Sequence, residues 1–106
     1  MRIDWSDQSL EDIEEIRRYI ARDSPVYAEA FVARIFEAAE RLINHPLSGR
    51  IVPEFDDPTL REIILGSYRI VHWVHDATIL VATVFHSARL LRPEDVPGMP
   101  ERLAGI

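Results

Sequence analysis

The sequence predicts one α+β domain in which a two-helix hairpin packs against a small antiparallel sheet, in the order β-α-α-β-β-β. Residues 7–45 contain two stretches of helical apolar spacing with a short break between them, and residues 60–85 contain three apolar runs separated by two-residue turns. A length of 106 residues suits one hydrophobic core. The balance of 47% apolar and 28% charged residues is typical of a globular protein.

A short strand and an amphipathic helix are expected first. Residues 1–5 alternate weakly and predict a strand, after which Ser6 and Asp7 begin a helix by satisfying its free N–H groups and its dipole. An apolar stripe follows at intervals of three and four residues: Leu10, Ile13, Ile16 and Ile20. This stripe predicts one buried face on the first helix.

A second helix is predicted directly after the first. Ser24 is a good N-cap, and Pro25 is favoured at the first helical position. Helical apolar spacing continues to about His45, and Pro46 ends the helix because proline disfavours helical backbone at the residue before it. Two helices joined by so short a turn form an antiparallel hairpin.

The period of the apolar pattern changes after the second helix. Residues 46–58 are interrupted by prolines and predict an irregular connection. Three apolar runs follow, and each predicts a strand: residues 60–65, 68–75 and 78–85. Because Gly66-Ser67 and Asp76-Ala77 are suitable two-residue turns, these strands should form an antiparallel meander.

The remaining residues predict the domain boundary. Residues 1–92 contain all the expected elements and form the domain. Residues 93–106 contain three prolines and few apolar side chains, so we expect a C-terminal tail able to order on a partner.

Composition excludes several classes of function. There is no cysteine, which excludes disulfides, thiolate metal cages and thiol nucleophiles and fits a cytoplasmic location. No segment resembles an export signal or a membrane span. The net charge of −6 argues against direct DNA binding by this chain alone. All twelve cationic residues are arginine, whose guanidinium pairs well with carboxylates and phosphates.

Spacing excludes other site types. The absence of lysine argues against a phosphate-binding loop. His72 and His75 are three residues apart on a predicted strand, so they point to opposite faces and should not share a metal ion. Ser87 beside His86 lacks the glycines of a nucleophile elbow. We therefore expect no metal, no cofactor and no hydrolase triad.

Six polar residues remain around the predicted sheet: Glu54, Arg61, Tyr68, Arg69, His86 and Arg89. If they converge, they hold part of the chemistry for cutting RNA: a carboxylate base for the 2′-hydroxyl, arginines for the phosphorane and a histidine acid. The alternative is that Arg61 and Arg69 pair with acidic neighbours while His86 packs at the rim of the sheet. Connectivity alone leaves both arrangements open.

A series of short motifs resembles the ParE branch of the RelE/ParE toxins. The motifs occur in the order found in that family and extend over nearly the whole chain. They are residues 19–25, Leu42, and residues 45–50, 52–54, 60–62, 68–71 and 86–89. The resemblance implies a bacterial type II toxin that inhibits growth and contributes to plasmid stabilisation. It also implies a cognate antitoxin that holds the toxin inactive in a hetero-oligomer.

The resemblance leaves two activities to weigh, because ParE-like members poison DNA gyrase and RelE-like members cut messenger RNA on the ribosome. Glu54, Arg69 and His86 align with ribonuclease residues, but Ser87 stands where the ribonuclease pattern has a tyrosine. The lysine-rich surface of ribosome-directed toxins is also missing. We therefore expect gyrase inhibition by binding. The contact residues would be Arg61, Tyr68, Arg69, His86 and Arg89.

Two alternatives remain for the function. The first is a ribosome-dependent endoribonuclease that uses Glu54, Arg69 and His86, assisted by Arg61. The second is a non-toxic family member that only binds its partner. For the antitoxin, a groove beside the helices and an edge strand are expected, which suit a helix in the groove or an added strand. The candidate apolar residues that would line this surface are Ile16, Tyr19, Tyr27, Phe31 and Trp73. Core packing is the alternative for these five residues, and it is the better expectation for Ile16 and Phe31.

Overall fold

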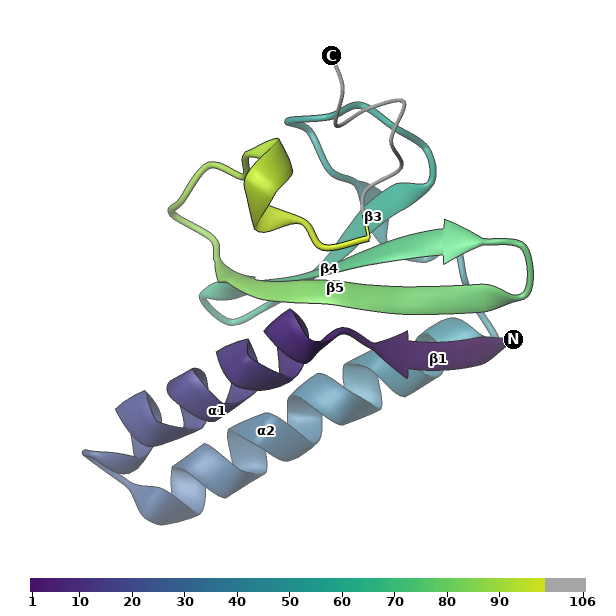
Figure 1. The fold of residues 1–106 in the computed structure, drawn as a ribbon. Coiled ribbons are helices and arrows are strands. Elements are labelled where there is room, and N and C mark those ends of the chain that lie inside the picture. Colours follow the sequence, from purple (N-terminus) through teal and green to yellow (C-terminus); the bar gives the residue numbers. More distant parts are fainter. Residues whose placement is uncertain (99–106) are drawn as a thin grey trace.

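Two helices cover one face of a five-stranded sheet, and the segment after the last strand covers part of the other face (Figure 1). The structure is a computed structural model and describes residues 1–98. Its elements are β1 (Arg2–Trp5), α1 (Asp7–Ala21), α2 (Pro25–Glu40), β2 (Arg50–Ile51), β3 (Leu60–Leu65), β4 (Tyr68–His75) and β5 (Thr78–His86). Short 3-10 helices span Arg41–Ile43 and Pro93–Asp95. The α+β class and the order of the main elements are confirmed.

The helical hairpin forms where the capping residues predict it. The Ser6 side chain accepts a hydrogen bond from the Ser9 N–H, and the Ser24 side chain accepts one from the Tyr27 N–H. Pro25 stands at the start of α2. The helix ends at Glu40 and continues as a 3-10 turn, so its α-helical part is shorter than the apolar spacing suggests.

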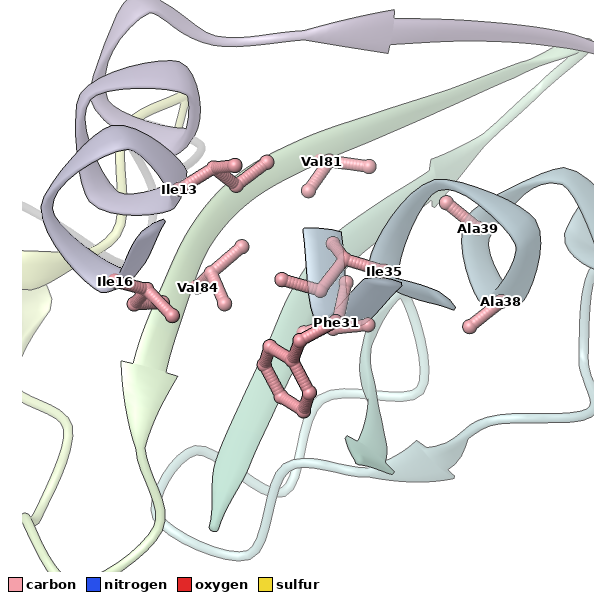
Figure 2. Packing of buried hydrophobic residues seen from close by; sticks show 9 residues of the cluster. Ile13, Ile16, Phe31, Ile35, Ala38, Ala39, Val81 and Val84 are labelled. Atoms are coloured by element: carbon pink, nitrogen blue, oxygen red, sulfur yellow. The ribbon is translucent and has the colours of Figure 1, made fainter. Parts of the chain in front are cut away.

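The main core lies between the hairpin and the sheet (Figure 2). Ile13 and Ile16 of α1 and Ile35 of α2 point toward Val81 and Val84 of β5. Fully burying an aliphatic side chain of this size contributes roughly 1.5–3 kcal/mol, which is enough to fix both helices on the same face. We call this face of the sheet the helix side.

The sheet is mixed, which corrects the expectation of a purely antiparallel one. Strand order is β1-β5-β4-β3-β2, and β3, β4 and β5 form the predicted antiparallel meander. In contrast, β1 runs parallel to β5, with Arg2 opposite Thr78 and Trp5 opposite Val81. A parallel neighbour requires a long crossover, and the helical hairpin is part of it. The two-residue β2 lies within the segment expected to be irregular.

A second apolar cluster covers the other face of the sheet, which we call the outer face. It includes Trp73 and Phe85 of the sheet and Leu91 and Val96 of the segment that follows. The indole Nε1 of Trp73 donates a hydrogen bond to the Pro97 carbonyl at 3.2 Å. Residues 93–98 of the expected tail therefore pack on the domain, while residues 99–106 lie outside the described part of the chain. Among the described residues, no helix has the length and apolar character to cross a membrane.

Candidate functional site

Arg69 is held in the interior of the outer face. It lies on β4 with 4% of its surface exposed. Its Nη1 and Nη2 donate to the two carboxylate oxygens of Glu54, each at 2.7 Å, and its Nε donates to Glu62 at 2.5 Å. Nη1 also donates to the Arg89 carbonyl at 3.2 Å. These four hydrogen bonds leave the guanidinium little capacity to bind a phosphate.

Glu54 and Glu62 extend this contact into a chain of alternating charges. Glu62 is 1% exposed and also accepts a hydrogen bond from Arg50 Nε at 2.5 Å. We call Arg50, Glu62, Arg69 and Glu54 the ion-pair chain. Hydrogen bonds from Arg69 lower the pKa of Glu54 to about 2, and the bonds to Glu54 raise the pKa of Arg69. Glu54 and Arg69 are therefore charged and paired with each other at neutral pH.

His86 lies on the opposite face of the sheet from Arg69. Phe85 belongs to the outer-face cluster, so the next residue on the strand points to the helix side. There the His86 ring stands edge-on to the Tyr68 ring, with centroids 5.5 Å apart, and Tyr68 packs on Phe31. His86 is exposed, and its Nδ1 accepts the Ala88 N–H at 3.1 Å. The fold thus joins Glu54 to Arg69 but separates His86 from both.

Arg61 serves the loop before β3. Its Nε donates to the Pro58 carbonyl and its Nη1 to the Gly49 carbonyl, both at 2.9 Å. The alternative of acidic pairing therefore holds for Arg69 but not for Arg61, whose hydrogen bonds go to backbone oxygens. Neither arginine lies in the groove described next.

A groove of about 640 Å³ runs between α1 and the last part of β5. Tyr68, His86 and Arg89, all expected to contact a target, line it together with Ile16 and Tyr19, expected to contact an antitoxin. The groove also contains four acidic residues: Asp12, Glu15, Glu94 and Asp95. Burial raises the pKa of the Tyr68 hydroxyl, so this group stays protonated at neutral pH. Two sets of residues predicted for different partners therefore share one surface.

The other residues expected to bind the antitoxin take different positions. Tyr19 and Tyr27 expose 64% and 52% of their surfaces near the turn of the hairpin. Ile16 is 7% and Phe31 4% exposed, and both belong to the helix-side core, as the packing alternative predicts. Trp73 is 5% exposed and is packed on the outer face, which removes it from the candidate surface.

Some residues of these arrangements were missed at the sequence level. Two of them, Glu62 and Arg50, complete the ion-pair chain. The sequence signal for Glu62 was a carboxylate that alternates with apolar residues on a predicted strand. Asp12 of α1 accepts hydrogen bonds from Thr83 Oγ1 at 2.5 Å and from the Val84 N–H at 3.1 Å. Within residues 1–98, no three His, Cys, Asp or Glu side chains gather as a metal site.

Comparison with known proteins places the chain among toxins. The family model described as "ParE toxin of type II toxin-antitoxin system, parDE" matches residues 3–91. Toxin RelE2 of Caulobacter vibrioides is 33% identical over 87 residues, covering 81% of this chain and 94% of the relative. The protein Y4kP of Sinorhizobium fredii is 43% identical over 87 residues, covering 81% of this chain and 88% of the relative.

A solved structure shows the same fold. The chromosomal ParDE TA system from P. aeruginosa contains a chain that superposes with a TM-score of 0.66 at 20% identity, covering 81% of this chain and 95% of that one. The family match extends over the hairpin, the meander and the groove residues that come from α1 and β5. This chain belongs to the ParE toxin family of type II toxin–antitoxin systems.

Proposed function

We propose that this toxin acts in the cytoplasm by binding DNA gyrase, and that a cognate antitoxin neutralises it in a hetero-oligomer. The observation that carries the proposal is the separation of the ribonuclease residues. Arg69 is buried in the ion-pair chain, while His86 lies on the other face of the sheet. Because Arg69 and His86 do not share a site for one phosphate, binding to another protein explains the activity better than RNA cleavage does.

The charges support the same conclusion. A general base works best when its pKa lies near the working pH, whereas Arg69 holds the pKa of Glu54 at about 2. The net charge of −6 also disfavours contact with ribosomal RNA, whose binding depends on released counterions. Binding to gyrase requires neither a free guanidinium in the interior nor a basic carboxylate.

The groove offers the surface for the target. Tyr68, His86 and Arg89 are its polar and aromatic members at the end of β5. The Arg89 guanidinium lies over the Phe85 ring at 4.4 Å from the centroid, which holds an exposed cation in place. Aromatic and arginine side chains of this kind dominate binding energy in protein interfaces.

A supercoiling assay with purified toxin and gyrase tests the proposal. We expect inhibition by the natural chain and about tenfold weaker inhibition by Arg89→Ala, since arginine anchors often contribute this much. Arg34→Ala is the matched control because Arg34 also lies over an aromatic ring, that of Phe31, but outside the groove. Absence of inhibition and of trapped cleavage complexes at large toxin excess would remove gyrase as the target.

One observation favours the second candidate, a ribosome-dependent endoribonuclease. Glu54 and Arg69 do lie together, with two hydrogen bonds of 2.7 Å between them. Primer extension on translated messages after toxin induction tests this activity. Codon-phased cuts that disappear in His86→Ala but persist in the exposed control His75→Ala would make the ribonuclease the better assignment.

For the antitoxin, we propose contact mainly with the exposed Tyr19 in the groove and Tyr27 near the hairpin turn, and with the small part of the core residue Ile16 that reaches the groove. The two tyrosines present large amphipathic surfaces at little cost in side-chain entropy. Because the same groove contains Tyr68, His86 and Arg89, a bound antitoxin covers the proposed target surface. The antitoxin would then neutralise the toxin by occupying the groove and blocking access of the target.

A further inference from the structure

The second half of β5 is an open strand edge beside the groove. β1 pairs only with residues 78–81, and the chain then turns into α1, so within residues 1–98 no strand lies next to residues 82–86 on that side (Figure 1). Thr83, Val84, Phe85 and His86 all line the groove. An edge of this kind can accept a further strand through backbone hydrogen bonds.

Hydrogen bonds among the described residues leave two backbone groups at positions 84 and 86 of this edge free. The Ser87 N–H bonds to the Ser67 carbonyl on the β4 side, so by alternation Val84 and His86 direct their N–H and C=O groups outward. The Val84 N–H is already taken by Asp12, at 3.1 Å. The His86 carbonyl is taken by the Arg89 N–H, also at 3.1 Å. What remains is the carbonyl of Val84 and the N–H of His86.

These two groups select the direction of an incoming strand. An antiparallel strand could also reach the Val84 C=O and the His86 N–H. The residue opposite Val84 would then point its own C=O at the Asp12 carboxylate that already accepts the Val84 N–H, and these two acceptors repel each other. In a parallel pair, one incoming residue donates to the carbonyl before its partner and accepts from the N–H after it. The free groups flank Phe85 in this way. The edge therefore fits one parallel bridge, in the same sense in which β1 pairs with β5.

The charge of the groove indicates the side chains of the occupant. Residues before and after the one opposite Phe85 would point to the helix side, toward Ile16, Tyr19 and Glu15. Within residues 1–98 the Glu15 carboxylate has no ion pair or hydrogen bond, although it lines the groove. An apolar residue suits Ile16 and Tyr19, and a cation suits Glu15.

We propose that an extended segment of the antitoxin adds to β5 as a parallel strand opposite Phe85 and places a lysine or arginine against Glu15. The inference rests on the proposed antitoxin partnership and assigns the edge, direction and charge of the contact. Asp12 accepts the Val84 N–H when no partner is bound. This hydrogen bond leaves fewer free backbone groups on the edge, which limits pairing with unrelated chains.

Amide hydrogen exchange and backbone substitution test the strand. The probe is the protein encoded by the reading frame adjoining that of the toxin. In the complex, we expect the His86 amide to become at least tenfold more protected, while the Val84 amide, already bonded, changes less. His86→Pro removes the N–H at an edge position that tolerates proline and should weaken binding about tenfold or more. His86→Ala keeps the N–H and separates the backbone contribution from that of the imidazole.

Charge reversal tests the cation. Glu15→Arg should weaken the complex about tenfold, mostly through electrostatic repulsion, and the loss should shrink at high salt. Glu37→Arg makes the same change in net charge at an exposed position of α2 outside the groove, and it should bind within about twofold of the natural chain.

The outcomes distinguish this inference from the function on which it rests. If the natural chain forms no complex with the adjoining protein, both fail. If a complex forms but His86 protection is unchanged and His86→Pro binds as tightly as His86→Ala, the strand is wrong while the partnership stands. Protection of His86 that rises with toxin concentration alone would assign the edge to a second copy of this chain and overturn the proposal.

Discussion

His72 is a titratable residue in the interior of the protein. It is fully buried, its Nδ1 lies 3.2 Å from the Ile70 carbonyl, and its Nε2 has no hydrogen-bond partner within the described chain. Gly49 lies directly against the ring, where a Cβ would approach Cε1 to 3.1 Å and the Glu62 carbonyl to 2.9 Å. Burial, together with the positive charge of Arg61, lowers the pKa of His72 from 6.5 to about 4. The imidazole is therefore neutral at physiological pH.

We predict a loss of stability in mild acid that depends on His72. Above pH 6.5 the residue is neutral in both states and contributes no pH dependence. Below it, the unfolded chain gains a proton that the folded chain resists, so stability falls until about pH 4, by up to roughly 3 kcal/mol. Urea unfolding between pH 7.5 and 4.5 measures this, with His72→Leu compared with the natural chain.

The variant should lose most of this slope, whereas His75→Leu, at an exposed position, should keep it. Glu54 does not confuse the comparison, because its lowered pKa makes its stabilisation disappear only as pH falls from 4.5 toward 2. An equal slope in His72→Leu and the natural chain would contradict the prediction.

At the scale of elements, α1 protects the edge of β5 as well as covering the core. The Ser6 hydroxyl donates to the Ala82 carbonyl at 2.6 Å, and Asp12 accepts from the Val84 N–H and Thr83 Oγ1 one helical turn and a half later. These contacts replace the hydrogen bonds that β1 would make if it were longer. The helix therefore fixes where β5 is paired and where the groove begins.

We predict that Asp12→Ala lowers stability by about 1–3 kcal/mol, because it removes a charged acceptor from two part-buried donors. The same change should accelerate amide exchange at Val84. Glu11→Ala, at an exposed neighbouring position of α1, is the control and should shift stability by less than about 0.5 kcal/mol. Unchanged Val84 exchange in Asp12→Ala would show that this hydrogen bond is not formed in solution.

Across the whole molecule, the ion-pair chain connects segments far apart in the sequence. It joins Glu54 of the loop, Arg50 of β2, Glu62 of β3 and Arg69 of β4. The segment after β5 is attached as well, since Glu54 accepts the Leu91 N–H at 2.8 Å and Arg69 donates to the Arg89 carbonyl. Arg69 and Glu62 are deeply buried, while Arg50 at the end of the ion-pair chain is exposed. Removing one of the buried members leaves the charge of its partner without compensation in the interior.

We predict that Arg69→Met destabilises the protein by about 3–5 kcal/mol, since it leaves the Glu54 and Glu62 carboxylates without their main partner. This is a large share of the stability of a small domain. The double variant Arg69→Met/Glu62→Met should recover much of the loss, because it also removes the most deeply buried charge. Denaturant unfolding of both variants measures the difference, and a double variant no more stable than Arg69→Met would contradict the explanation.

Local signals were sufficient for much of the architecture. The caps at Ser6 and Ser24, the helical spacing of Ile13 and Ile16, and the turn at Gly66 act within a few residues, so the hairpin and the meander could be predicted. Pairing between distant segments could not. Nothing near β1 indicates that it lies parallel to β5, and nothing near Val96 indicates that it packs against Trp73.

The sequence by itself determined the elements, their order and the membership of a toxin family, because these depend on periodicity, capping and motifs read along the chain. Only the tertiary structure decided the site. Whether Arg69 meets Glu54 or His86 depends on which face of the sheet each side chain takes, and strand alternation makes that depend on register and on the bulge in β5. Register and bulge are set by contacts between segments that are distant in sequence. The separation of His86 from Glu54 and Arg69 could therefore not be predicted from local patterns.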